Sequence, residues 1–279
     1  MLSDFFRCPR SGQTLIQDDQ ALVSEDGQHT YTIVDGVPDF YIEEDKSIIQ
    51  ADDANRKWLD AHAVKGRNIH YERCREWEGM SFCIEQIARL SHPACRVLEV
   101  GAGTGHFSRW LAKSCQTGTQ IYCFDFSWPC IETIKIRIAD LSNVDLFRAN
   151  ARGPMPFAPC SFDVILQRLA PFSPKGVEQQ EKAQRVLDLL TPGGHYIFGG
   201  WEDEYGGSCE DHIQNGFARA QHHRWAYPYH FEDEEFVGGL MEGGATRLEA
   251  EAKLSEARSK TNGLFTVRKE HLFIAQKPG

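Results

Sequence analysis

The sequence lacks several features that mark out whole classes of protein. No apolar run approaches the roughly 20 residues that a membrane-spanning helix needs. The opening MLSDFFRCPR has no cationic segment followed by an apolar stretch. The nine cysteines are unevenly spaced, and several lie inside apolar runs such as IYCF and SFCIEQI, where small buried thiols are common. We therefore expect a cytoplasmic protein without a disulfide framework.

A basic surface is also missing. The chain has 30 Lys and Arg against 40 Asp and Glu, a formal net charge of -10. The excess of acidic residues is concentrated in residues 1–60, with a net charge of -8, and in residues 201–260, with -7. Without a long basic stripe to meet phosphate groups, nucleic acid is a disfavoured partner.

The length of 279 residues and a hydrophobic content of 41% suit one large domain with an appendage. Residues 1–46 read as short strands separated by turns, TLIQ, ALVS and TYTIV before the turn at 35–38, which predicts a small β unit. Residues 47–94 are helical in composition and end at Ser91-His92-Pro93. They predict a helical connector.

Residues 95–279 predict an α/β domain with a doubly wound, mostly parallel seven-stranded sheet, because short β-branched runs alternate with amphipathic stretches. The expected core strands are 96–100, 120–125, 144–148, 162–167 and 195–198, and the expected helices are 107–113, 128–141 and 177–190. A further helix is expected near 232–241. The strand-like runs 246–255 and 264–276 could pair as an antiparallel hairpin at the sheet edge.

The segment RVLEVGAGTGHFSRWLA joins a buried strand to a helix through Gly101, Gly103 and Gly105. Glycine tolerates positive φ and lets a ligand touch the backbone. At the carboxyl end of a central strand in a doubly wound sheet, such a turn is where a nucleotide-like ligand binds. A dinucleotide fingerprint would read G-x-G-x-x-G, but the last glycine position holds His106, which disfavours NAD.

Two acidic residues flank this turn in the expected fold. Glu99 precedes the first glycine, where a carboxylate would repel a pyrophosphate but attract a cationic ligand. Asp125 ends the second strand, 22 residues after Gly103. A carboxylate there can accept both hydroxyls of a ribose. The pattern indicates a positively charged nucleoside.

With these pieces in place, residues 95–200 resemble the class I S-adenosylmethionine-dependent methyltransferases. The matching motifs are LEVGAGTG, IYCFDFS, NARGPMPFAPCSFDVILQ and LLTPGGHYIF. The resemblance implies a Rossmann-like fold with S-adenosylmethionine as cofactor. The implied cofactor-binding residues are Glu99, Gly101, Gly103, Gly105, Asp125, Phe126, Asn150, Ala151 and Gln167. Gln167 and Arg168 would face the reactive methyl or the substrate.

Structural alternatives remain for single residues of this set. A glycine-rich turn between strand and helix can be purely structural, and Asp125 could act as a helix cap. Asn150, where the family commonly has aspartate, could be turn chemistry alone.

The N-terminal unit, with FRCPRSGQTL and ALVSEDGQHTYTIVDGVPDFY, resembles the small ribbon domain of activator subunits of tRNA and protein methyltransferases. Metal-binding versions of that domain hold zinc through two cysteine pairs. Only Cys8 of that set remains, so we expect no metal here. Cys8 should serve packing, and the ribbon could dock on its own catalytic domain or on a protein partner. The fused arrangement also resembles the large-subunit rRNA guanine methyltransferases.

The acceptor site is the least determined part of the sequence. The stretch 201–230 is rich in aromatic residues and histidine and could form a lid, although a surface helix with solvated histidines is an alternative. The substrate candidates are Tyr71, Arg168, Trp201, His222 and His223, and Arg67 accompanies Tyr71 in the connector. No catalytic residue can be assigned, because methyl transfer needs chiefly alignment.

The sequence thus predicts a methyltransferase for a small-molecule acceptor. An rRNA or tRNA base methyltransferase and a non-catalytic cofactor-binding partner protein are the alternatives.

Overall fold

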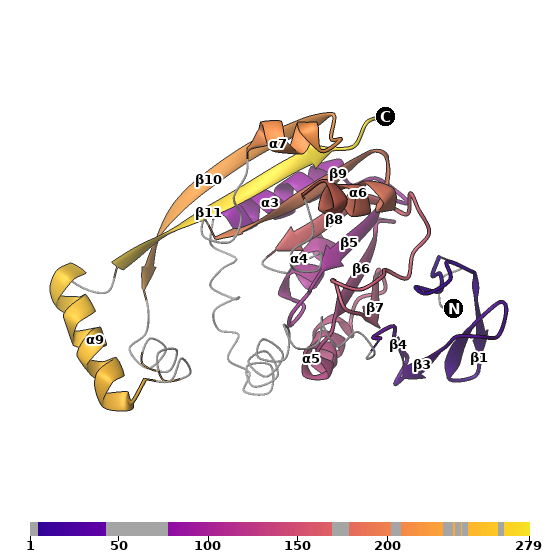
Figure 1. The fold of residues 1–279 in the computed structure, drawn as a ribbon, viewed down its shortest axis with the longest axis horizontal. Coiled ribbons are helices and arrows are strands. Elements are labelled where there is room, and N and C mark those ends of the chain that lie inside the picture. Colours follow the sequence, from indigo (N-terminus) through magenta and orange to yellow (C-terminus); the bar gives the residue numbers. More distant parts are fainter. Residues whose placement is uncertain are drawn as a thin grey trace.

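The main body of the protein is one seven-stranded sheet with the strand order β10-β11-β9-β8-β5-β6-β7 (Figure 1). The structure is a computed structural model and describes residues 5–42, 78–168, 179–201, 208–230, 237, 241, 245–261 and 265–279. Five strands run parallel: β5 (Arg96–Val100), β6 (Gln120–Asp125), β7 (Val144–Arg148), β8 (Phe162–Arg168) and β9 (Leu190–Trp201). The antiparallel strands β11 (Phe265–Gln276) and β10 (Arg219–His230) complete one edge. The predicted fold class is confirmed.

Helices cover both faces of this sheet. On one face lie α3 (Glu78–Leu90), α4 (His106–Ser114) and α5 (Trp128–Ile138), and on the other lie α6 (Gln179–Leu189) and α7 (Cys209–Gln214). Strand β8 shows why both faces need cover, since Val164 and Leu166 pack toward α3 and α4 whereas Phe162 and Ile165 pack toward α6. Such continuous apolar runs are typical of strands buried on both sides.

None of the described helices combines the length and the apolar character needed to cross a membrane.

The C-terminal region differs from the sequence-based expectation at residues 246–255, which form a helix instead of a strand. Helix α9 (Arg247–Thr261) begins with a reciprocal capping box. Glu249 N donates to Thr246 Oγ1 at 3.3 Å, and Thr246 N donates to Glu249 Oε2 at 2.8 Å. The alternation of apolar and polar residues matched a strand, but Ala, Leu, Glu and Lys are strong helix formers. The prediction of a strand here was wrong.

The antiparallel hairpin at the sheet edge exists, but with a different first strand. β11 pairs with β10, which lies in the stretch 201–230 that was expected to be a lid or a surface helix. The pairing runs from Arg219↔Gln276 to His230↔Phe265, whereas β9 ends its pairing with β11 at Trp201↔Glu270. The hairpin therefore extends past the end of β9 toward α9 (Figure 1).

The N-terminal unit is a four-stranded antiparallel sheet of β1 (Leu15–Asp18), β2 (Ala21–Ser24), β3 (Thr30–Val34) and β4 (Val37–Pro38). Asp35 and Gly36 form the predicted turn, and Gly36 has a φ of 80°. Cys8 is buried, and its Sγ lies 3.2 Å from the Tyr31 hydroxyl. The cysteine thus packs inside the unit. The connector before residue 78 lies outside the described residues.

The N-terminal unit, residues 5–42 and hereafter the ribbon, docks on its own main domain beside β7 (Figure 1). Asp39 forms a parallel bridge with Arg148 of β7, and Phe6 forms an antiparallel bridge with Phe157. Phe6 also packs its ring against Phe147 at a centroid distance of 5.5 Å. Since β7 is the last strand of the sheet, the ribbon covers the carboxyl end of an edge that would otherwise present unpaired backbone groups there.

Candidate cofactor and acceptor site

The turn after β5 is built on three left-handed glycines. Gly101, Gly103 and Gly105 have φ values of 66°, 57° and 77°. A Cβ added at Gly103 would meet nothing within 4 Å, so this side of the turn is open to a ligand. A Cβ at Gly105 would lie 3.1 Å from Ile134 Cγ1. Gly105 therefore also allows the close packing of the turn against α5.

Asp125, at the end of β6, is held against this turn. Its Oδ2 accepts a hydrogen bond from Gly103 N at 2.9 Å, and its Oδ1 accepts one from Ser127 N at 3.0 Å. The residue is buried. Two backbone amides thus fix the carboxylate beside the glycine turn, and its role toward a ribose stays a prediction.

Glu99, the last residue but one of β5, is buried below the turn and accepts a hydrogen bond from Ser108 Oγ at 2.5 Å. Burial, together with the charge of Asp125, raises the pKa of its carboxyl to about 8. The Glu99 carboxyl therefore keeps its proton at neutral pH. A cationic group brought beside it would favour the ionised form.

A pocket opens between the glycine turn and the face covered by α3 and α4. Its lining comprises residues 99–104 of the strand end and turn, Met80 of α3, His106 and Phe107 of α4, and Arg168 of β8. The structure thereby brings together four of the predicted site residues, Glu99, Gly101, Gly103 and Arg168. The polar groups of this pocket sit at the carboxyl edge of the parallel strands, where ligands bind in doubly wound sheets.

Arg168 forms an ion pair with Glu270 of β11. The two side chains are 9% and 0% exposed, so both charges are shielded from water. Among the described residues, Nε and Nη1 of Arg168 have no hydrogen-bond partner. Sequence reasoning missed Glu270, because a single acid in the strand FTVRKEHLFIAQ carries no signal of a buried charge.

Three further predicted cofactor residues make other contacts. Gln167 is buried and accepts a hydrogen bond from the Tyr196 hydroxyl, on the sheet face opposite Arg168. Asn150 Oδ1 accepts from Arg152 N at 3.0 Å, which is the local turn chemistry that the sequence left open. The Ala151 carbonyl accepts from Arg185 Nη2 at 3.0 Å. Their roles toward a cofactor stay predictions.

The histidine candidates lie on opposite faces of β10. His222 Nε2 lies 3.1 Å from His271 Nδ1, and its ring stacks on Phe273 at a centroid distance of 4.1 Å. His223 packs against Phe82 of α3. Neither histidine lines the described pocket. Trp201 ends β9 opposite Glu270, and Tyr71 and Arg67 lie outside the described residues.

His106, which stands where a dinucleotide fingerprint has glycine, is buried at the start of α4. Its Nδ1 lies 3.1 Å from Arg137 Nη1. Burial, together with the charge of Arg137, lowers the pKa of His106 to about 4. The ring is therefore neutral at physiological pH and packs below the turn.

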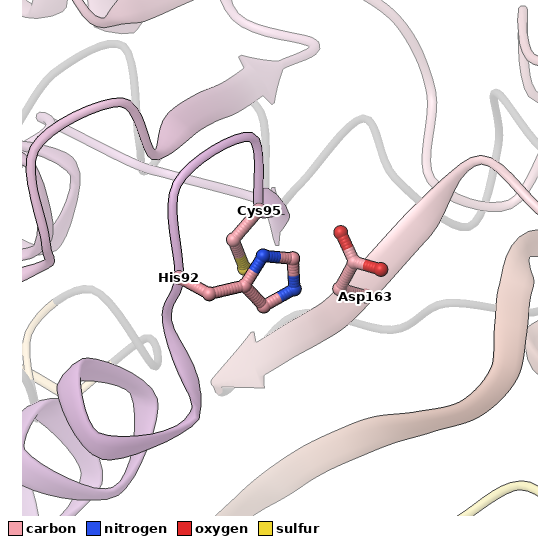
Figure 2. Close-up of side chains that lie close together, drawn as sticks. All are labelled: His92, Cys95 and Asp163. Atoms are coloured by element: carbon pink, nitrogen blue, oxygen red, sulfur yellow. The ribbon is translucent and has the colours of Figure 1, made fainter.

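A different cluster lies at the amino ends of β5 and β8, where His92, Cys95 and Asp163 approach one another (Figure 2). Their contacts are structural. Asp163 Oδ2 accepts from Arg96 N at 2.8 Å, and its Oδ1 accepts from Thr191 Oγ1 at 3.0 Å. Burial raises the pKa of the Cys95 thiol to about 11. These contacts hold the amino ends of β5 and β8 in place, and we assign no metal to the cluster.

Comparison with known proteins shows which class of protein this chain is similar to. Residues 97–194 match a family model described as a methyltransferase domain. The YcgJ protein from Bacillus subtilis is 19% identical, with a TM-score of 0.52 over 71% of this chain and 99% of that one. A chain from the complex between the Haloferax volcanii Trm112 methyltransferase activator and a candidate methyltransferase is 14% identical, with a TM-score of 0.50 over 79% and 98%. A search of curated proteins found no match.

The fold and the glycine turn are thus those of a Rossmann-like methyltransferase. Residues 97–194 carry the methyltransferase domain, and the cofactor that the sequence motifs imply for it is S-adenosylmethionine. The residues present fit this cofactor. The open side of Gly103 leaves room for it, Asp125 offers oxygens to hydroxyls, and buried Glu99 can neutralise a positive charge.

Proposed function

We propose that this protein transfers a methyl group from S-adenosylmethionine to a small-molecule acceptor bound at the pocket beside Arg168. The observation that carries the proposal is the convergence of Glu99, the glycine turn and the shielded Arg168 on one pocket. The acidic composition, with a formal charge of -10, supports a small acceptor over a polyanion.

The residues of the donor site have separate tasks in this proposal. Glu99 and the Gly101–Gly105 turn hold the methionine portion, and Asp125 holds the ribose. Phe126, Asn150 and Ala151 line the adenine slot. S-Adenosylmethionine supplies the methyl group as an electrophile, and the chain positions the acceptor in line with it. Such alignment can lower the activation barrier by about 7–11 kcal/mol in the best-oriented reactions.

Arg168 indicates what the acceptor carries. Its guanidinium is shielded by the fold and lines the pocket, and two of its nitrogens have no hydrogen-bond partner among the described residues. Buried donors without partners are costly. An acceptor with a carboxylate or carbonyl oxygen would satisfy them. Glu270 would hold Arg168 in place while this oxygen binds.

The first test is parallel calorimetric titration with S-adenosylmethionine, S-adenosylhomocysteine and NAD. Micromolar binding of the two sulfur nucleosides without NAD would support the proposed donor site. Release of S-adenosylhomocysteine in the presence of small carboxylated or heterocyclic acceptors would then support turnover. Cofactor binding without turnover of any acceptor would favour the non-catalytic partner protein.

The RNA alternative makes a separate prediction. Phosphate contacts give a retention that falls steeply with salt. If the chain retains RNA with such a slope and methylates it, the small-molecule proposal is wrong. Weak retention that does not depend on salt would count against an RNA acceptor.

A further inference from the structure

The ribbon is connected to the cofactor side of the main domain by more than apolar packing. Its last described segment runs beside β7, where Phe40 N donates to the Arg148 carbonyl at 2.8 Å and Asp39 bridges Arg148 in parallel. Arg7 N donates to the Pro156 carbonyl at 2.9 Å on the neighbouring loop. The ribbon thus fixes the backbone at the carboxyl end of β7, next to the strand that carries Asp125.

The side chain of Arg148 continues this connection. Its Nη1 donates to Asp39 Oδ2 at 2.9 Å, and its Nε donates to the Phe126 carbonyl at 2.8 Å. The guanidinium lies 4.3 Å from the ring centroid of Tyr41 and 5.1 Å from that of Trp128. The ion pair is well shielded, with side-chain exposures of 11% for Arg148 and 17% for Asp39.

The carbonyl that Arg148 holds belongs to the loop of the donor site. Phe126 directly follows Asp125, whose two oxygens accept hydrogen bonds from Gly103 N and Ser127 N. One unbroken chain of contacts therefore leads from a carboxylate of the ribbon to the glycine turn. Its links are three hydrogen bonds with an ionised group and the backbone between Asp125 and Phe126, and hydrogen bonds with an ionised group are stronger than neutral ones.

We infer that the ribbon is a built-in positioning module for the donor site, and that it acts through the Asp39–Arg148–Phe126 contact. Arg148 is a positioning residue, since it orients the loop that carries Asp125 and does not itself line the described pocket. This inference rests on the proposed donor site. It assigns to the ribbon the adenosine half of that site, rather than the acceptor half.

The matched variants are Asp39→Ala, Asp39→Asn and Lys135→Ala. Lys135 Nζ contacts the Asp35 carbonyl at 2.8 Å, so its removal breaks another contact between ribbon and domain without touching the 125–127 loop. The probes are S-adenosylhomocysteine and 5′-methylthioadenosine, which keeps the adenosine but lacks the amino-acid portion.

We expect Asp39→Ala to weaken binding of both probes by about 5- to 10-fold, as for the loss of one charge-assisted contact. Asp39→Asn should lose less, because it keeps an acceptor for Arg148. Lys135→Ala should leave both affinities unchanged even where its melting temperature falls. Equal affinities in Asp39→Ala and Lys135→Ala would overturn the inference, because a purely structural ribbon would lower stability alone.

Amide hydrogen exchange tests the same link without any ligand. The amides of Gly103 and Ser127 should exchange faster in Asp39→Ala than in Lys135→Ala. Unchanged exchange at both amides would also contradict the inference. If the unmodified chain failed to bind S-adenosylhomocysteine, the proposed function would fail, whereas the exchange result would still decide whether the ribbon orders this loop.

Discussion

Arg168 and Glu270 form a shielded ion pair across an intervening strand. Arg168 ends β8, Glu270 lies in β11, and β9 runs between them. The register partner of Arg168 in β9 is Gly199, and a Cβ there would collide with the His271 carbonyl. Gly199 therefore lets the backbones of β9 and β11 approach closely beside the ion pair.

The ion pair predicts a strong dependence of stability on Glu270. Glu270→Gln leaves Arg168 shielded without a counter-charge, and we expect a loss of about 3 kcal/mol in the free energy of unfolding. The double variant Arg168→Met with Glu270→Leu should regain most of the lost stability. It should not regain methyl transfer, because Arg168 is absent. Urea unfolding and a turnover assay measure both effects.

The control for this prediction is Glu251→Gln, which breaks the exposed pair of Arg247 and Glu251. An exposed pair contributes well under 1 kcal/mol in most cases. If Glu270→Gln proved no more destabilising than Glu251→Gln, the pair would be solvated and Arg168 would not be a preorganised donor.

The donor site predicts that Asp125→Ala and Gly103→Val each abolish cofactor binding while the fold is largely kept. Asp125→Ala removes the proposed ribose contact and the anchor of Gly103 N. Gly103→Val places a branched side chain at a φ of 57° on the open side of the turn. Calorimetric titration with S-adenosylhomocysteine checks both variants.

Gly27→Val is the matched control, because Gly27 has a φ of 70° and open space but lies in the ribbon. It should carry a similar backbone cost and leave cofactor affinity intact. Wild-type affinity in both Asp125→Ala and Gly103→Val would remove this site assignment.

Glu99 predicts that cofactor affinity depends on pH. Its pKa of about 8 in the free protein means that the ionised form, which a cationic amino group or sulfonium prefers, is in the minority at pH 7. Affinity for S-adenosylhomocysteine should therefore rise with pH up to about 8, by at most roughly tenfold per unit. Binding should release a proton, which titrations in buffers of different ionisation enthalpy detect.

The raised pKa of Glu99 also makes the stability of the fold depend on pH. The folded pKa of Glu99 lies above the ordinary glutamate value of 4.5, so its favourable contribution is fully present below that value and is lost as pH rises toward 8. Glu99→Gln should flatten both dependences. Glu85→Gln, at an exposed position of α3, should change neither, and an unaltered pH profile in Glu99→Gln would contradict the assignment.

Because the ribbon packs on the main domain, we expect the two to unfold together in one cooperative transition. Phe6 is 4% exposed and packs against Phe40, Phe147 and Phe157. Phe6→Ala should cost about 3–5 kcal/mol. Ile16→Ala, at a position that is 56% exposed in β1, should cost little. Two separate thermal transitions in the unmodified chain would show that ribbon and domain unfold independently.

The sequence predicted the parallel core well because local pattern and tertiary burial agree there. The expected strands 96–100, 120–125 and 144–148 are the observed β5, β6 and β7. Prediction and structure differ in the C-terminal part of the chain. The segment 246–255 alternates like a strand, yet the capping box at Thr246 and Glu249 makes it a helix.

The rest of the site depends on contacts between residues that are distant in sequence. β10 has few β-branched residues, so only its pairing with β11 reveals it as a strand. Asp39 and Arg148 are 109 residues apart, and Arg168 finds Glu270 across another strand. No local pattern encodes such pairs, whereas the glycine turn and Asp125 belong to a motif with fixed spacing.

The cover that the ribbon gives to the end of β7 also has a consequence for folding during synthesis. Phe6 leaves the ribosome long before Phe147 and Phe157, the rings against which it packs. At ordinary synthesis rates this interval lasts about 7 to 30 seconds. During that time the ribbon must hold its own strands together while one of its large apolar side chains waits in water. A chain that meets a finished copy in this interval is at risk of pairing with that copy's β7 instead of its own.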